Sequence, residues 1–429
     1  MMKKVNIFWF RRDIRLCDNS GLHHALQSGL PVLPIFIFDT EILNKLENKS
    51  DRRVDYFHQA LHTIHEKLLE HKSGIDFYVG TPLEVFEQLI KKYEINTVFW
   101  NNDYEPQAIK RDTTIAEFLK KNKINFQHYK DQVIFEKNEV VKKDGLPYTV
   151  YTPYSNKWKE NLKNIEIINF KIDFSGFLPF SAKRIPSLES LGFKKTRTQY
   201  IPPVLSDSII TTYDLYRDFP SMDHTTHLGV ALRFGTISIR ECVQYALLHN
   251  NTWLNELIWR DFFMQILFHF PRVVYHCFKE KYENIEWRND EKEFRLWCEG
   301  KTGYPIVDAG MRELNETGFM HNRVRMIVAS FLTKHLLIDW RWGEVYFAEK
   351  LLDYDLSANN GNWQWAAGCG CDAAPYFRVF NPYEQTKKFD KDLKYIKKWL
   401  SKEDFTVLPV VEHAFARKRA LEVYSKAVK

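Results

Sequence analysis

The chain has 429 residues, of which 45% are hydrophobic and 27% are charged, as expected for a globular protein of about two or three domains. Its formal net charge of +6 permits a nucleic-acid partner, although a solvated Lys-rich surface gives the same charge. Six scattered cysteines do not indicate a disulfide framework, and the sequence shows neither a membrane span nor a signal-peptide pattern. We therefore expect a cytoplasmic protein without membrane contact.

The first part of the chain alternates strand patterns with helix patterns. Short β-branched and aromatic runs predict buried strands at residues 5–10, 32–38, 75–79 and 96–100. A helix is predicted over 52–70, and another begins with the capping box Thr81-Pro82-Leu83-Glu84. This alternation predicts a doubly wound, Rossmann-like α/β domain with a parallel sheet over residues 1–130.

The rest of the chain divides into two parts. Residues 131–205 are Lys-rich, contain prolines and lack a clear period, which predicts a long interdomain connector on the surface. Residues 206–429 have a helical pattern, which predicts a large all-α domain. The predicted helices are 237–249, 253–270, 292–299, 305–317, 321–337, 343–353 and 411–427.

The most informative segment is 359–382, with the sequence NNGNWQWAAGCGCDAAPYFRVFNP. Trp363 and Trp365 stand among small residues that let a flat ligand approach, and the indoles offer faces for stacking. A core helix would not need this mixture, so we interpret the segment as a site for a planar molecule. Cys369-Gly370-Cys371 could be half of a metal site, but no second Cys/His pair accompanies it, and we expect no metal.

Residues 253–260, WLNELIWR, place a carboxylate among aromatic side chains. On a helix, Glu256, Trp259 and Phe263 share one face. Burying a carboxylate is costly unless something binds it, and this cost favours a binding site. The alternative is an exposed Glu256–Arg260 pair at i, i+4.

Three further polar segments are ambiguous when each is taken alone. Asn322 and Met326 share a helix face and could meet a ring edge, or could belong to an ordinary helix N-terminus. Asp353 and Asp355 could hold a ligand or cap a helix. Residues 223–229, DHTTHLG, could hold phosphates or provide a simple N-cap.

Together, these segments resemble the photolyase/cryptochrome family, and most closely its class I photolyases, which repair cyclobutane pyrimidine dimers. Further similar motifs are GYPIVDAGMRELNETGFMHNRVRM (303–326), FWFRRDIRL near the N-terminus, NNDYEP (101–106) and YTVYTPYSNKW (148–158). The resemblance implies an α/β antenna domain followed by a helical FAD-binding domain. It also implies that light drives an electron from reduced FAD to a flipped-out dimer and that the dimer then splits into two pyrimidines.

The resemblance further implies roles for individual residues. The FAD site would be formed by Tyr213, Thr225, Thr226, His227, Leu228, Gly229, Trp253, Glu256, Arg260, Asn322, Arg325, Asp353, Asp355 and Asn359. Catalysis at the dimer would involve Glu256, Asn322, Trp259, Met326 and Trp365. DNA would be bound by Trp259, Arg323, Arg378 and Gln385. Electrons would reach the flavin from the surface through Trp287, Trp340 and Trp363.

A second, antenna chromophore is defined less closely by the resemblance. Glu105 matches a residue that often holds a folate, but PRVVYHC (271–277) does not match the folate-binding pattern. The identity of the antenna therefore stays open between a folate, a deazaflavin and another flavin, and so does its presence.

The implied partner is DNA that contains UV-induced pyrimidine dimers, bound by a monomer without an obligate protein partner. Two other functions stay open, a blue-light-sensing cryptochrome and a photolyase for the (6-4) photoproduct. The chemistry of the (6-4) enzymes uses a histidine pair where this chain has Asn322 and Met326, and plant-type sensors commonly have Asp where it has Asn359. These residues favour dimer repair. A generic flavoprotein or a single-strand-binding module would not require Glu256 together with the tryptophan chain.

Overall fold

The computed structural model describes residues 2–429 and divides into two compact units. The first unit comprises Met1–Glu136, Leu162–Leu205 and His227–Leu248, and the second comprises Lys137–Asn161, Ser206–Thr226 and His249–Lys429. The domain limits expected at residues 130 and 205 stay a prediction, because units defined by contacts need not coincide with domains. Within the described residues 2–429, no helix is long and apolar enough to cross a membrane.

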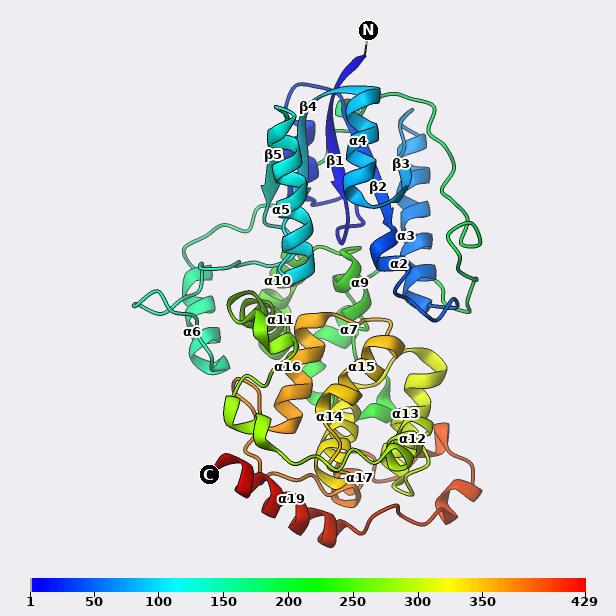
Figure 1. Ribbon diagram of the computed structural model, residues 1–429, viewed down its shortest axis with the longest axis vertical. Coiled ribbons are helices and arrows are strands. Elements are labelled where there is room, and N and C mark those ends of the chain that lie inside the picture. The colour runs from blue at the N-terminus through cyan, green and yellow to red at the C-terminus, as the bar shows by residue number, and fades with distance from the viewer. Residues whose placement is uncertain (1) are drawn as a thin grey trace. The chain divides into compact units, whose positions relative to one another are not determined.

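A five-stranded parallel sheet with the order β3-β2-β1-β4-β5 forms the first unit (Figure 1). Its strands are β1 (Lys3–Phe10), β2 (Val32–Asp39), β3 (Asp76–Gly80), β4 (Tyr93–Asn101) and β5 (Asn125–Tyr129). The four predicted strands and the doubly wound α/β class are confirmed. β5 lacks an apolar run because it is an edge strand with largely exposed residues, so its sequence gives little strand signal.

The alternation of side chains along β1 separates two hydrophobic layers. Phe8 and Phe10 belong to one layer with α1 (Ser20–Leu26) and α3 (Arg52–Leu69). Val5, Ile7 and Trp9 belong to the other layer. This second layer is covered by α4 (Pro82–Lys92) and α5 (Pro106–Lys121), in front of the sheet in Figure 1. The first unit also contains α2 (Thr40–Leu43), α9 (Gly229–Phe234) and nearly all of α10 (Ile239–His249).

The second unit is helical, as predicted. Its helices are α6 (Tyr151–Leu162), α7 (Asp207–Ile210), α8 (Tyr213–Tyr216), α11 (Asn251–His269), α12 (Glu291–Glu299), α13 (Pro305–Thr317), α14 (Asn322–Ser330), α15 (Trp340–Lys350), α16 (Leu356–Ala367), α17 (Pro382–Phe389), α18 (Lys394–Trp399) and α19 (His413–Val428). The helices predicted near 253, 292, 305, 343 and 411 are confirmed, with ends that differ by a few residues.

The structure refines two interpretations of this unit. The helix predicted over 321–337 is confirmed as α14, which continues without a break into the π-helical turn Phe331–His335. Leu337 has φ of +50°, which an α-helix cannot include. The first part of the segment 359–382, as far as Ala367, lies in α16, because Asp355 caps the first turn of this helix and Gly368 ends it with φ of +91°.

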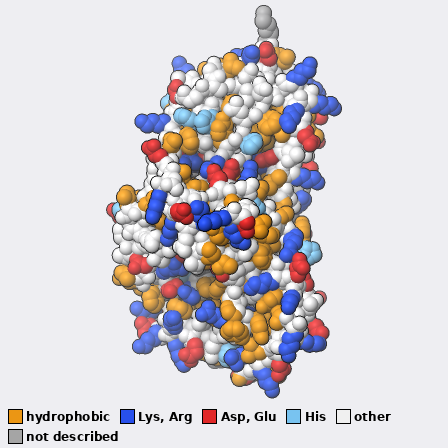
Figure 2. Space-filling view, turned by 90° about the vertical axis from the view of Figure 1, so that its left-hand side faces the viewer, with side chains coloured by type: hydrophobic (Ala, Val, Ile, Leu, Met, Phe, Trp, Pro, Cys, Tyr) orange, Lys and Arg blue, Asp and Glu red, His pale blue; other side chains and the backbone are white. Residues whose placement is uncertain are grey.

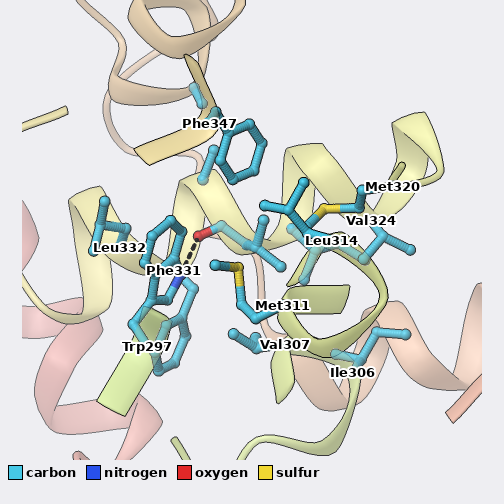
Figure 3. Close-up of a cluster of buried hydrophobic side chains, with 14 of the residues drawn as sticks. Trp297, Ile306, Val307, Met311, Leu314, Met320, Val324, Phe331, Leu332 and Phe347 are labelled. Atoms are coloured by element: carbon cyan, nitrogen blue, oxygen red, sulfur yellow. Dashed lines mark hydrogen bonds between the residues drawn. The ribbon is translucent and has the colours of Figure 1, made fainter. Parts of the chain in front are cut away.

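The core of the second unit is built from α12, α13, α14, α15 and the π turn (Figure 3). Trp297 is fully buried, and its indole Nε1 donates to the carbonyl oxygen of Val328 at 3.2 Å. Met311, Leu314 and Phe347 pack into the same cluster. This core therefore holds α14 and α15, two helices that contribute residues to the site described below.

Gly343 of α15 lets Trp363 of α16 pack directly onto the helix backbone. A β-carbon at this position would lie 2.1 Å from a ring carbon of Trp363. We predict that Gly343→Ala lowers the free energy of unfolding by about 1–3 kcal/mol, because overpacking outweighs the better helix propensity of alanine. Urea unfolding followed by circular dichroism measures the change, with Val345→Ala at an exposed position of α15 as the control. Equal stability of Gly343→Ala and wild type would contradict this close packing.

Candidate functional site

A cavity lies among residues of α14, α15, α16 and the segment between α15 and α16. It is lined by Asn322, Arg325, Met326, Ala329, Phe347, Leu351, Asp353, Tyr354, Asp355, Ala358, Asn359, Asn362, Trp363, Trp365 and Ala366. The structure thus brings together the predicted residues Asn322, Arg325, Met326, Asp353, Asp355, Asn359, Trp363 and Trp365. Apolar walls with a few polar side chains suit a planar ligand with polar edges.

Two carboxylates fix one wall of this cavity in different ways. Asp353 accepts a hydrogen bond from Arg325 Nη2 at 2.9 Å, and Arg325 Nε also donates to the Met320 carbonyl oxygen at 2.7 Å. Asp355 accepts from the backbone N–H groups of Ser357 and Ala358. The capping alternative is therefore correct for Asp355, whereas Asp353 orients a guanidinium at the cavity.

Asn359 is held in place by a residue that sequence reasoning missed. Its Nδ2 donates to Glu344 Oε1 at 2.9 Å and to the Glu344 carbonyl oxygen at 3.1 Å. Burial raises the pKa of Glu344, and the hydrogen bond from Asn359 partly offsets this rise. A carboxyl group one helix away thus fixes the amide plane of Asn359, which no local sequence pattern indicates.

The three predicted relay tryptophans differ in burial. Trp363 lines the cavity and packs edge-on against Phe347, with ring centroids 5.0 Å apart. Trp340 is fully buried in the same core cluster, and Trp287 is half-buried at its margin. The role of these three tryptophans as an electron relay stays a prediction.

Glu256 lies on α11 and forms an ion pair with Arg217, which follows α8. This partner differs from the Arg260 that the i, i+4 spacing suggested. Burial raises the pKa of Glu256, whereas the guanidinium of Arg217 lowers it. Sequence reasoning missed Arg217 because 39 residues separate it from Glu256.

Arg323 is also engaged by a carboxylate. Its Nη2 lies 2.6 Å from Asp218 Oδ1, and its guanidinium lies 4.3 Å from the ring centroid of Phe389. A DNA phosphate at Arg323 would therefore compete with Asp218. Asp218 also lies 4.0 Å from Arg217, so the Arg323 and Glu256 ion pairs are neighbours.

The other predicted DNA-contacting residues lie on α11, on α17 and in the segment between α16 and α17. Trp259 is half-buried on α11, Arg378 is exposed, and Gln385 is half-buried on α17. The Arg378 carbonyl oxygen accepts from Lys334 Nζ at 2.9 Å, which ties this segment to the π turn. Burial lowers the pKa of Lys334 to about 8.

The remaining predicted FAD residues do not line this cavity. Tyr213 lies on α8, and the buried Trp253 and the half-buried Arg260 lie on α11. Thr226 is half-buried. Thr225 lines a second cavity together with His321, Lys394, Lys398 and others.

His227, Leu228 and Gly229 belong to the first unit. Leu228 occupies the N-cap of α9 without a side-chain hydrogen bond, so the suggestion of a simple polar N-cap in DHTTHLG is wrong. Glu105, the antenna candidate, belongs to the same unit. Its carboxylate lies 2.6 Å from Arg12 Nη1 and 3.2 Å from Arg233 Nη1.

The cysteines after α16 serve packing. Cys369 is fully buried, and its backbone carbonyl oxygen accepts from the N–H of Lys279 at 2.9 Å. A β-carbon at Gly370 would lie 3.0 Å from the backbone of Gln364. Among residues 2–429, no group of three or more His, Cys, Asp or Glu side chains has a metal-binding arrangement.

Comparison with known proteins covers both halves of the chain. Residues 6–171 match the family described as DNA photolyase, and residues 253–404 match the FAD-binding domain of DNA photolyase. Deoxyribodipyrimidine photo-lyase from Synechococcus sp. is 36% identical over 423 residues, which cover 92% of this chain and 87% of that relative. The enzyme of the same name from Escherichia coli is 34% identical, with 99% of each chain covered.

Solved structures agree with this relationship. A bacterial class III photolyase from Agrobacterium tumefaciens matches with a TM-score of 0.87 and 30% identity, covering 100% of this chain and 98% of that one. An archaeal photolyase from Sulfolobus tokodaii, solved with two FAD molecules, matches with a TM-score of 0.83 and 33% identity, covering 99% and 100%. Fold, cavity residues and relatives thus lead to one conclusion, that this chain belongs to the DNA photolyase family.

Proposed function

We propose that this chain is a deoxyribodipyrimidine photolyase, which uses FAD and light to split cyclobutane pyrimidine dimers in DNA. The cavity carries this proposal, because Asn359, the Arg325–Asp353 pair and Trp363 all line it. These residues fit FAD, since aromatic walls suit the ring system and amide and charged groups suit its polar edges. Bound in its reduced form, FAD would supply the light absorption and the electron for ring opening.

On the flavin side, the residues would bind and orient. Asn359, fixed by Glu344, would present its amide to the N5 edge of the ring system. Arg325, fixed by Asp353, would place a positive charge where the reduced, anionic ring carries negative charge. Asn322 lines the same cavity and would touch both flavin and lesion.

On the lesion side, Glu256 would hydrogen-bond the carbonyl and N–H edges of the dimer. Because burial raises the pKa of Glu256, its carboxyl group holds a proton more readily than an exposed glutamate, and a proton there stabilises charge on the dimer. Trp259 and Trp365 would pack against the flipped pair with Met326 beside it. The observation that Trp365 and Met326 line one cavity supports this arrangement.

DNA phosphates would be bound by basic side chains such as Arg323 and Arg378, with Gln385 nearby on α17. On the face shown in Figure 2, Lys and Arg side chains are interspersed with Asp and Glu side chains. The net charge of +6 is therefore not gathered into one patch on that face, and individual arginines would provide the phosphate contacts.

We further propose that the enzyme is a cytoplasmic monomer without an obligate protein partner.

A second chromophore could serve as a light-harvesting antenna. The Sulfolobus tokodaii relative was solved with two FAD molecules, which imply a novel light-harvesting cofactor in that protein. In this chain Glu105 stays the candidate, and its pairing with Arg12 and Arg233 means that a ligand there would meet positive charge as well. A folate, a deazaflavin or a flavin would each satisfy the proposal.

The proposed activity predicts the outcome of a repair assay on two defined lesions. Reduced, FAD-loaded protein under blue light should restore an oligonucleotide with one cyclobutane dimer and leave a (6-4) photoproduct unchanged. Separation of the repaired strands measures the yield, and a dark sample is the control. Repair of only the (6-4) lesion would contradict the proposal. Flavin binding without dimer binding or repair would support a cryptochrome-like sensor instead.

Replacement of Glu256 tests the lesion-side role. We predict that Glu256→Ala lowers the quantum yield of dimer repair roughly tenfold and leaves the FAD content unchanged, because one hydrogen bond to developing charge is lost. Glu349→Ala, at an exposed position of α15, is the matched control and should repair like wild type. Unchanged repair by Glu256→Ala would remove its proposed role.

Replacement of Trp340 tests the relay. We predict that Trp340→Phe lowers the rate of FAD photoreduction roughly tenfold or more, because phenylalanine is much harder to oxidise, whereas pre-reduced enzyme still repairs dimers. Trp342→Phe, two residues away on α15, is the matched control. Absorbance of the oxidised flavin under illumination measures the rate. Equal rates for wild type and Trp340→Phe would refute the relay.

A further inference from the structure

Helix α6 packs along α11, the helix that carries Glu256 and Trp259. The fully buried Trp158 donates from Nε1 to Asp261 Oδ2 at 3.1 Å. Six residues earlier on α11, Asn255 Oδ1 accepts a hydrogen bond from Lys159 Nζ at 2.8 Å. Although α6 lies inside the segment predicted as a surface connector, it is fixed to the helix of the proposed lesion site.

Tyr151, the first residue of α6, stacks on Trp259. The two ring centroids are 3.6 Å apart and the rings are 4° from parallel, a close face-to-face contact. Phe262 meets both rings edge-on, at 5.9 Å from Tyr151 and 5.6 Å from Trp259. The indole is therefore held in one plane by its neighbours.

Hydrogen bonds fix Tyr151 at both ends. Its Oη donates to the Asn255 carbonyl oxygen of α11 at 2.9 Å. Its backbone N–H donates to the Asp372 carboxylate, in the segment after α16, at 3.0 Å. Tyr151 thus joins three parts of the second unit, α6, α11 and the segment that carries Arg378.

Tyr151 also lies near Glu256. Burial raises the pKa of the Tyr151 phenol, and the Glu256 carboxylate raises it further. The phenol therefore stays neutral and presents an aromatic ring beside the two residues proposed to meet the dimer.

We propose that Tyr151 is a positioning residue for dimer recognition, which covers one face of the Trp259 indole and fixes the plane against which the flipped dimer packs. The proposal rests on the lesion-contacting role of Trp259 given above. A free indole would lose rotational freedom when a lesion packs on it, whereas an indole already held by Tyr151 loses little. Tyr151 therefore contributes to the preference for damaged over undamaged DNA.

The test compares Tyr151→Phe, Tyr151→Leu and wild type, each loaded with FAD, in equilibrium binding to oligonucleotides with and without one cyclobutane dimer. Tyr151→Phe keeps the stacked ring and should bind both within about twofold of wild type. Tyr151→Leu should bind the dimer about tenfold more weakly, as expected for impaired aromatic stacking, with unchanged affinity for undamaged DNA. Tyr275→Ala, an exposed tyrosine of the same unit, is the control.

Combination with Trp259→Ala separates positioning from direct contact. Because Tyr151 acts through Trp259, the Tyr151→Leu/Trp259→Ala double variant should bind the dimer as Trp259→Ala does. Losses that multiply in the double variant would overturn the proposal, as would wild-type dimer affinity of Tyr151→Leu. If Tyr151→Leu lost FAD, or lost as much affinity for undamaged DNA as for the dimer, the role of Tyr151 would be purely structural. That result would also overturn the proposal. Failure of wild type itself to bind dimers would instead refute the proposed function.

Discussion

The close approach of α16 to α11 and α15 is the constraint on which the site depends. Trp363 packs against the backbone at Gly343, and Phe263 packs against Gly361, where a β-carbon would lie 2.2 Å from its ring. Both contacts exist because a hydrogen atom stands where other residues have a side chain. They fix α16 so that Asn359, Trp363 and Trp365 reach one cavity, and they explain why small residues and large aromatics alternate in its sequence.

Charge is arranged around the site in fixed pairs. Arg325 and Asp353 lie at the cavity, Glu344 holds Asn359, and Arg217 neutralises Glu256. Pairing lowers the cost of burying each charged group and orients it before any ligand arrives. Asp218 pairs with Arg323 and lies close to Arg217, so the two ion pairs are neighbours. The folded chain thus already contains these ion pairs before any ligand binds.

Much of the fold could be predicted from the sequence because its signals are local. Runs of β-branched and aromatic residues identify buried strands such as 5–10 and 32–38. The capping box from Thr81 to Glu84 identifies the start of α4. α16 was harder to predict, because its Asn, Gly and Trp residues have modest helix propensity, although Asp355 and Gly368 provide its local start and stop signals.

The resemblance to a family, and not a local pattern, predicted the residues of the ligand site. The structure places five of them, Asn322, Arg325, Asp353, Asn359 and Trp363, around the cavity. Their supporting partners lie elsewhere in sequence. Glu344 acts on Asn359 and Arg217 on Glu256 across distances in the chain that no helical or strand period encodes. The contact between Tyr151 and Trp259 likewise joins a segment predicted as a connector to a site helix. Contacts of this kind require the folded chain.

The flavin content of a cavity-filled variant tests the central claim that this cavity holds FAD. Ala358 lines the cavity on α16, so Ala358→Trp places a large ring in the space. Wild-type protein should carry about one flavin per chain by absorbance and Ala358→Trp almost none, with the circular dichroism of both unchanged. Full flavin occupancy in a folded Ala358→Trp protein would contradict the account.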